Sequence, residues 1–119
     1  MSAKRVLIVE DDFMLSLINK KYMELMGHKV VASVTTGADA IAAAKEQKTD
    51  VILMDIRLDG KMDGIEAMIE IAKFSSVPAI YLSGNSDFEN KERASKTNMI
   101  AFCVKPIHFE QLQAFLLKI

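Results

Sequence analysis

The sequence predicts an α/β protein in which five parallel strands form a sheet between two layers of helices. Two observations support this prediction. Five short apolar runs are spread along the 119 residues, and a longer stretch with helical periodicity follows each run. The runs are almost continuously apolar, which is typical of parallel strands buried on both faces. Parallel strands joined by helical crossovers give a three-layer α/β/α sandwich.

The first strand is expected at residues 6–9 and the first helix at residues 12–26. Apolar side chains recur at helical spacing in this helix, and they are Leu15, Ile18, Tyr22, Leu25 and Met26. Gly27 follows at the position of a left-handed C-terminal cap. The second strand is expected at residues 30–34, and an alanine-rich helix suited to close packing follows at residues 37–47.

The third strand, residues 51–54, leads to a helix that begins near Asp63, which has capping-box spacing with Glu66. The fourth strand, residues 78–82, precedes a helix that opens with a capping box of Ser86 and Glu89. The fifth strand, residues 99–104, precedes a helix that starts soon after Pro106. The apolar stripe of that last helix comprises Leu112, Phe115, Leu116 and Ile119.

Length and composition exclude several classes of protein. A chain of 119 residues forms one domain, expected to span residues 1–119. No apolar run approaches the roughly 20 residues that span a bilayer, and the N-terminus lacks the apolar stretch of a signal peptide. The net charge of −1 lacks the basic excess of a nucleic-acid binder. The lone Cys103 cannot form an internal disulfide, so the cytoplasm is the expected location.

The functional site of an open parallel sheet lies at the carboxyl ends of its strands. Reactive residues follow four of the predicted strands: Glu10-Asp11-Asp12, Asp55, Ser83-Gly84 and Lys105-Pro106. An acidic turn after the first strand would repel phosphate, which excludes the glycine-rich loop of nucleotide-binding folds. Glu10, Asp11 and Asp55 instead offer the oxygen ligands that Mg²⁺ prefers.

Each of these residues also has an ordinary structural role. Asp11 or Asp12 could cap the first helix, and Asp55 could belong to a turn. Ser83 could be a loop hydroxyl, and Lys105-Pro106 could form a surface turn. However, two carboxylates about 4 Å apart repel by about 4 kcal/mol at an effective dielectric near 20. Lys105 offsets part of this repulsion, and a bound cation would offset the rest.

Five motifs occur in a specific order and spacing: residues 6–12 (VLIVEDD), 51–55 (VILMD), 62–66 (MDGIE), 81–84 (YLSG) and 104–106 (VKP). Together they resemble the receiver domain of two-component response regulators over nearly the full chain. The resemblance implies a doubly wound, flavodoxin-like sheet with the strand order 2-1-3-4-5. It also implies a signalling domain that catalyses its own phosphorylation and dephosphorylation rather than an enzyme acting on a small molecule.

The resemblance implies a role for each matching residue. Asp55 would be the phosphoacceptor, attacking the phosphohistidine of a sensor histidine kinase or a histidine phosphotransfer protein. Asp11 would bind Mg²⁺ directly with Glu10 assisting, and Asp55 and the backbone carbonyl of Arg57 would complete the protein ligands. Mn²⁺ could replace Mg²⁺. Lys105 would pair with the phosphoryl group, and a cis Lys105–Pro106 peptide is expected.

Further roles concern switching. Ser83 would bond a phosphoryl oxygen and, together with the aromatic Phe102, would form the switch. Arg57, Gly84 and Asn85 flank the site, and we expect Arg57 and Asn85 to set the lifetime of phospho-Asp55. The surface formed by the helix that opens with Ser86, the strand at residues 99–104 and the helix after Pro106 would bind partners, an output domain or a second copy, without contacts to nucleic acid or membrane. Met1 suggests a natural start, and the end at Ile119 permits a trimmed chain.

The sequence departs from the family pattern at two places. The loop between Asp55 and Asp63 is one residue longer than in the chemotaxis-type receiver, with Asp59 where many members have proline. Phe102 stands where many members have tyrosine, which removes a hydroxyl group from the switch.

Two other functions are alternatives. An aspartyl-phosphate hydrolase of the haloacid-dehalogenase type needs an aspartate two residues after its nucleophile, where this chain has Arg57. A degenerate receiver would bind partners without phosphorylation. Elsewhere in the chain, Lys91, Arg93 and Lys96 are interpreted as a solvated helix face, and His28 and His108 as surface residues.

Overall fold

The computed structural model describes residues 3–84 and 88–119, in which strands and helices alternate along the chain. The elements are β1 (Arg5–Val9), α1 (Phe13–Leu25), β2 (Lys29–Val34), α2 (Gly37–Glu46), β3 (Val51–Asp55), α3 (Gly64–Ile71), β4 (Ala79–Ser83), α4 (Phe88–Ser95), β5 (Met99–Val104) and α5 (Phe109–Leu116). The predicted series of strands and helices is confirmed. Asp55 and Ser83, expected just after their strands, are instead the last residues of β3 and β4.

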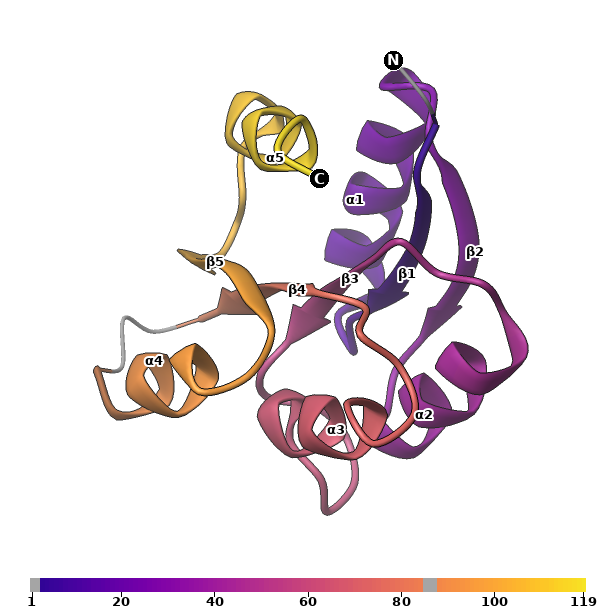
Figure 1. The fold of residues 1–119 in the computed structure, drawn as a ribbon. Coiled ribbons are helices and arrows are strands. Elements are labelled where there is room, and N and C mark those ends of the chain that lie inside the picture. The colour runs from indigo at the N-terminus through magenta and orange to yellow at the C-terminus, as the bar shows by residue number, and fades with distance from the viewer. Residues whose placement is uncertain (1–2, 85–87) are drawn as a thin grey trace.

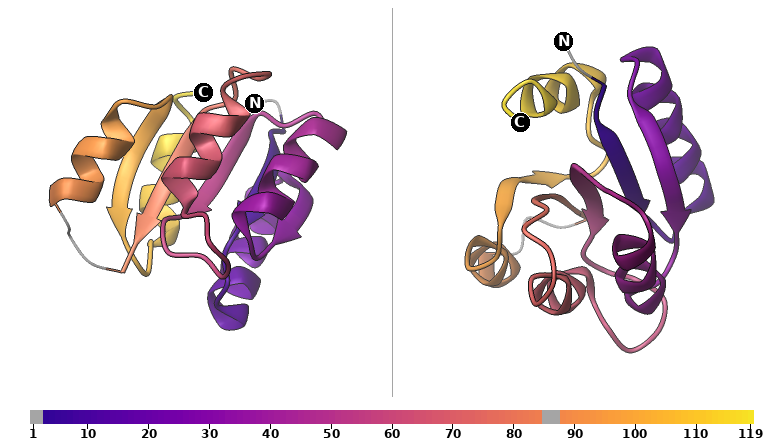
Figure 2. Two further views of the ribbon diagram at one scale, coloured as in Figure 1. Left: turned by 90° about the horizontal axis from the view of Figure 1, so that it is seen from below. Right: turned by 45° about the vertical axis from the view of Figure 1, so that its right-hand side comes forward.

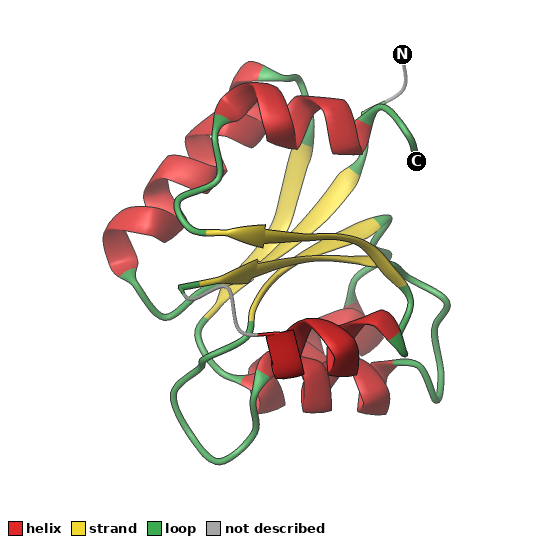
Figure 3. Cartoon of the chain, turned by 90° about the vertical axis from the view of Figure 1, so that its left-hand side faces the viewer, coloured by secondary structure: helices red, strands yellow, loops and turns green. Residues whose placement is uncertain are grey.

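The strands form one parallel sheet with the order β2-β1-β3-β4-β5, as the resemblance implied. Helices α1 and α5 cover one face of the sheet, and α2, α3 and α4 cover the other (Figures 1 and 3). The strand arrows point the same way, so their carboxyl ends meet at one edge (Figure 2). No described helix has both the length and the apolar character needed to cross a membrane.

Side chains alternate between two apolar cores along each central strand. In β1, Val6 and Ile8 join the core beneath α1 and α5, whereas Leu7 and Val9 join the core beneath α2 and α3. Strands β3 and β4 are buried at every residue, but β2 and β5 are only partly buried because each lies at an edge of the sheet. This difference explains why the central strands have the most continuous apolar runs.

Helix α1 buries the predicted apolar face only in part: Leu15, Tyr22 and Met26 are half-buried, and the last two pack against the core. Asn19 and Met23 are its buried residues, whereas Ile18 and Leu25 are 39% and 65% exposed. The prediction was wrong for Ile18 and Leu25 because α1 has apolar residues on both sides, and their periodicity does not reveal which side meets the sheet. The C-terminus was predicted correctly: Gly27 has a φ of +84°, and the His28 amide donates to the Met23 carbonyl at 2.9 Å.

The other helix ends agree with the sequence pattern in part. Asp63 and Glu66 form the predicted capping box of α3, with reciprocal hydrogen bonds of 2.8 and 2.9 Å. The Ser86 part of the second capping box lies outside the described residues. In α5, Leu112 and Leu116 are buried, but Ile119 is exposed because the helix ends at Leu116.

Candidate functional site

The register of the parallel strands brings the predicted site residues to one edge of the sheet. Val9 of β1 pairs with Met54 of β3, so Glu10 and Asp55, the residues that follow them, are level with each other. Ser83 of β4 pairs with Val104 of β5, and Lys105 comes next. Residues far apart in the sequence are therefore neighbours because the strands are parallel and in register.

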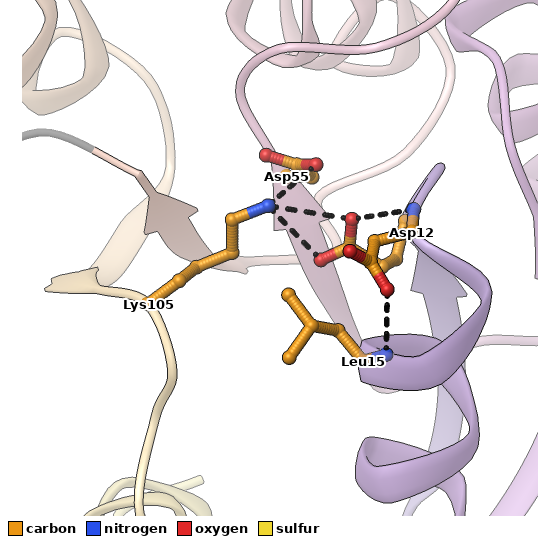
Figure 4. A network of polar contacts seen from close by, with 5 residues as sticks. Asp12, Leu15, Asp55 and Lys105 are labelled. Carbon is orange, nitrogen blue, oxygen red and sulfur yellow. Dashed lines mark hydrogen bonds and ion pairs between the residues drawn. The ribbon is translucent and has the colours of Figure 1, made fainter.

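Three carboxylates and one ammonium group form the centre of this site. Each of Glu10, Asp11 and Asp55 offers an oxygen, and these oxygens lie within 4.8 Å of one another. The Nζ atom of Lys105 lies 3.0 Å from Oδ2 of Asp55 and 3.3 Å from Oε1 of Glu10. Figure 4 shows Lys105 reaching across from the end of β5 toward Asp55. A compact oxygen cluster of this kind has the chemistry of a site for a hard divalent cation.

Burial makes the cluster electrostatically unusual. Asp55 is 1% exposed and Glu10 is 2% exposed, whereas Asp11 is exposed at the rim. Burial, reinforced by the hydrogen bond and the negative charge of Glu10, raises the pKa of Asp55 to about 8 despite the opposing effect of Lys105. Burial alone would lower the pKa of Lys105, but its contacts with Asp55 and Glu10 raise it. Once Asp55 is ionised, the three carboxylates therefore carry more negative charge than one lysine neutralises.

The structure distinguishes the roles of the three consecutive acidic residues. Asp12 is the N-cap of α1, since its Oδ1 accepts a hydrogen bond from the Leu15 amide at 3.0 Å. The Asp12 amide in turn donates to Oε2 of Glu10 at 3.0 Å, which orients the Glu10 carboxylate (Figure 4). The capping role considered for Asp11 or Asp12 therefore belongs to Asp12. Asp11 contributes its carboxylate to the cluster instead.

The ends of β4 and β5 complete the edge of the site. Ser83 is buried at 5% exposure, and its backbone carbonyl accepts a 2.7 Å hydrogen bond from the Lys105 amide. The Lys105–Pro106 peptide is cis, the conformation that the resemblance implied. Gly84 is exposed, and a Cβ there would meet open space. Asn85 lies outside the described residues.

The loop between β3 and α3 runs toward α2. Asp59 forms a parallel bridge with Thr36, and the Met62 side chain packs against Gly37 at the start of α2. Gly60 has a φ of +92°, a conformation that glycine adopts readily. The Arg57 side chain in this loop is exposed. The loop is therefore attached to the start of α2, although most of its residues are exposed.

The sequence did not indicate several contacts of α4 and β4 with other elements. Arg93, interpreted as part of a solvated face, is half-buried and forms a 3.1 Å ion pair with Asp63. The centroids of the Phe102 and Tyr81 rings are 6.5 Å apart, and the Tyr81 hydroxyl group is 2.7 Å from Oγ1 of Thr97. No local sequence pattern predicts these contacts, because each contact joins different elements of the fold.

His28 is also less exposed than predicted. Its ring is half-buried, and Nδ1 accepts a 2.9 Å hydrogen bond from the Lys4 amide. Burial, together with the positive charge of Lys4, lowers the pKa of His28. His108 is exposed, as predicted.

Known proteins with similar sequences share this arrangement of elements. The family described as response regulator receiver domain matches residues 6–117 of the chain. The chain is 30% identical over 109 residues to the transcriptional regulatory protein PdtaR of Mycobacterium tuberculosis, covering 92% of this chain and 53% of that protein. The chain spans between about a quarter and about half of the first curated relatives it matches.

Solved structures agree closely with the fold. The signal receiver domain of a modulated diguanylate cyclase from Desulfovibrio desulfuricans G20 has a TM-score of 0.91 at 27% identity, over 98% of this chain and 93% of that one. The receiver domain of the sensor histidine kinase PA1611 from Pseudomonas aeruginosa PAO1 has a TM-score of 0.86 at 29% identity, over 98% and 97% of the two chains. That structure is described with a magnesium ion coordinated in the active site cleft.

Proposed function

The chain belongs to the response regulator receiver domain family of two-component signal transduction, and from this premise we propose that it accepts a phosphoryl group on Asp55 in a Mg²⁺-dependent reaction. The observation that carries the proposal is the buried Asp55 carboxylate, bonded to Lys105 and clustered with Glu10 and Asp11. We assign residues 1–119 to a single receiver domain and place it in the cytoplasm, where the buried Cys103 would stay reduced.

In the proposed reaction, an Asp55 oxygen attacks the phosphorus atom of a phosphohistidine on the donor protein. A P–O bond forms as the P–N bond breaks, and the imidazole leaves with a proton taken up from water. Aspartate carboxylates are established covalent nucleophiles. Because phosphoryl transfer depends mainly on positioning and charge stabilisation, the Lys105 ammonium group beside Oδ2 of Asp55 is well placed to bind the transferred group. Hydrolysis of the acyl phosphate would return Asp55 to its free form.

The donor atoms fit a Mg²⁺ ion. We assign Asp11 and Asp55 as direct carboxylate ligands, Glu10 as an assisting ligand and the backbone carbonyl of Arg57 as a further ligand; Mn²⁺ would fit the same oxygens. When bound, the metal neutralises charge on the phosphoryl oxygens. The protein would hold these ligands in place through the Asp12 amide, which orients Glu10, and the end of β3, which positions Asp55.

Ser83 and Phe102 would convert phosphorylation into a change of surface. The Ser83 side chain would turn toward a phosphoryl oxygen, and Phe102, which is half-buried beside Tyr81, would turn inward. The surface of α4, β5 and α5 would then change its preference for a partner, an output domain or a second copy. Arg57 and Asn85 would set the lifetime of phospho-Asp55 by controlling the access of water, and Gly84 would leave room for the phosphoryl group.

The donor protein would approach from the side of α1. Phe13 and Met14, in the first turn of α1, are 73% and 63% exposed, and Leu17 is exposed on the following turn. An apolar surface beside Asp55 is suited to a protein partner, because a histidine kinase or phosphotransfer protein must cover this edge to deliver its phosphoryl group.

The test is the intact mass of the purified protein after incubation with acetyl phosphate, with and without Mg²⁺. One added phosphoryl group that requires both Mg²⁺ and Asp55 is expected. The variant Asp55→Asn should give no adduct, whereas the control Asp59→Asn, which removes an exposed acid from the loop that follows β3, should be phosphorylated normally.

If no adduct forms, two-dimensional NMR spectra recorded with Mg²⁺ and beryllofluoride, a phosphoryl mimic, would distinguish between two explanations. A clear spectral response would mean that phospho-Asp55 is too short-lived to collect. No response would contradict the proposal and favour the degenerate receiver, which binds partners without phosphorylation.

A further inference from the structure

In helix α4 (Phe88–Ser95), the described side chains at residues 89–95 are mostly exposed or half-buried. Within residues 89–95, the part of α4 whose burial is described, only Ala94 is buried. By contrast, α3 has the same length and buries five residues. Polar contacts therefore contribute to the interaction that holds this described part of α4 in position.

One polar contact attaches the end of α4 to β4. The hydroxyl group of Thr97 donates to the Ala94 carbonyl at 2.7 Å, and the Tyr81 hydroxyl lies 2.7 Å from the same Thr97 oxygen. Since the Thr97 hydrogen is used, Tyr81 is the donor in the second bond. This contact involves the far end of α4 and does not reach the phosphoacceptor site.

A second polar contact connects the last turn of α4 to the start of α3. Nη1 of Arg93 lies 3.1 Å from Oδ2 of Asp63 and also donates to Oδ1 of Asn90 at 3.1 Å. The other carboxylate oxygen of Asp63, Oδ1, accepts the Glu66 amide and caps α3. A single side chain, Asp63, thus holds α3 through one oxygen and α4 through the other.

The backbone next to Asp63 is in contact with the phosphoacceptor. The Gly64 amide donates to the Ile56 carbonyl at 2.8 Å, and Gly64 packs directly against the backbone carbonyl of Asp55. A displacement of the backbone at the end of β3 would therefore move Asp63. Because Asp63 is bonded to Arg93, such a movement would change the contact that Asp63 makes with α4.

We propose that the Arg93–Asp63 ion pair is a latch that links the position of α4 to occupancy of the phosphoacceptor site, a proposal that rests on the function proposed above. The latch is closed in the arrangement where the Lys105 ammonium group is bonded to the bare carboxylates of Asp55 and Glu10. It favours that arrangement over the phosphorylated one. By reciprocity, weakening the latch makes the site bind a phosphoryl group more tightly.

The exposure of the pair limits the size of this effect. The Arg93 and Asp63 side chains are 40% and 27% exposed, and ion pairs of this kind change an equilibrium constant by about two- to fivefold. Such a bias would adjust the balance between the two arrangements without locking either one.

The test measures the affinity for beryllofluoride in the presence of Mg²⁺, by NMR titration. Arg93→Gln removes one partner, and Asp63→Asn removes the charge of the other while keeping an oxygen that can cap α3. Each variant should bind about two- to fivefold more tightly than the wild type. The double variant should bind no more tightly than either single variant, because both changes break the same contact. Lys91→Gln, which removes an exposed charge from the same helix, should leave the affinity unchanged.

Hydrogen exchange of residues 88–97, measured without beryllofluoride, is the second readout. Exchange should be faster in Arg93→Gln and Asp63→Asn but not in Lys91→Gln, and 1 M NaCl should bring the wild type closer to the two variants by screening the pair. Unchanged affinity or additive effects in the double variant would overturn the latch. If the wild type does not respond to beryllofluoride at all, the proposed function is overturned. In that case the hydrogen exchange still tests the latch, and equal exchange rates in the wild type and the two variants would overturn it.

Discussion

Gly64 lies directly against the backbone carbonyl oxygen of Asp55, and a Cβ atom at residue 64 would overlap both that oxygen and the Met54 side chain. The first turn of α3 therefore packs on the backbone of the proposed phosphoacceptor itself.

We expect Gly64→Ala to lower the free energy of unfolding by about 1–3 kcal/mol, since a backbone atom cannot move aside as a flexible side chain can. Urea denaturation would measure the change. Gly84→Ala is the control, because its added Cβ meets open space and its cost should stay within about 0.5 kcal/mol. Equal effects of the two substitutions would show that α3 can shift away from Asp55.

The pKa of Asp55 predicts how stability depends on pH without metal. The carboxyl group has its ordinary pKa of 3.8 when the chain is unfolded, and burial next to Glu10 raises the pKa to about 8 in the folded protein. Its contribution to stability is therefore complete below pH 3.8 and is lost as the pH rises through about 8. Relative to Asp55→Asn, the wild type should lose on the order of a few kcal/mol over this range. Urea denaturation in the presence of a chelator would measure both proteins, and a pH-independent difference between them would contradict the expectation.

Mg²⁺ should reverse this loss. Since the ion binds carboxylates in their charged form, millimolar Mg²⁺ should raise the melting temperature of the wild type, and more at pH 8 than at pH 6. Differential scanning calorimetry would measure the shift. Asp11→Asn should reduce it by removing one of the three clustered carboxylates. An equal Mg²⁺ effect in Asp55→Asn and the wild type would place the bound ion away from this cluster.

Lys105 stabilises two buried carboxylates at once. Its Nζ atom lies 3.0 Å from Asp55 and 3.3 Å from Glu10, and its own side chain is 17% exposed. Lys105→Met should lower the free energy of unfolding at pH 8 by about 2–4 kcal/mol, because it leaves the buried Glu10 carboxylate and the partly ionised Asp55 without a cation. The loss should be smaller at pH 5, where Asp55 holds its proton. The control is Lys73→Met, which breaks an exposed pair with Glu70 and should cost less than about 0.5 kcal/mol.

The Tyr81 hydroxyl group connects β4 to the end of α4. It bonds to Oγ1 of Thr97, and burial raises the pKa of Tyr81 to about 12. Tyr81→Phe should lower the free energy of unfolding by about 0.5–1.5 kcal/mol, and Tyr81→Phe combined with Thr97→Val should cost less than the sum of the single changes. Chemical denaturation of the wild type, the two single variants and the double variant would complete this double-mutant cycle. Simple additivity would show that the two hydroxyl groups contribute independently.

His28 should make the protein sensitive to mild acid. Its Nδ1 atom accepts the Lys4 amide only when unprotonated, and burial lowers its pKa below the ordinary value of 6.5. The contribution of His28 to stability is therefore fully present above pH 6.5, and it is lost as the pH falls through the lower pKa that His28 has in the folded protein. Melting temperatures should show a steeper decline below pH 6.5 for the wild type than for His28→Gln. His108→Gln, at an exposed histidine, should follow the wild type, and parallel curves for all three proteins would contradict this role of His28.

The general plan of this protein could be predicted from its sequence because local patterns determine it. Continuous apolar runs predicted the parallel strands, and the position of Asp63 before Glu66 predicted the start of α3. The convergence of Glu10, Asp55 and Lys105 followed from one rule, that the carboxyl ends of parallel strands meet at one edge of the sheet. These features need only a strand's length, a helix's period or a cap's spacing, all of which are contained in a few consecutive residues.

The tertiary structure decided what depends on contacts between elements. The buried face of α1 centres on Asn19 and Met23, although the apolar spacing favoured Ile18 and Leu25, because the packing of a helix against the sheet selects among its apolar sides. Arg93 is bonded to Asp63, which is 30 residues away in the sequence. The raised pKa of Asp55 results from burial, a property of the whole fold. Distances between elements and the exclusion of water arise only when the layers are assembled, so a local pattern could name the residues of this site but not their contacts or their charge.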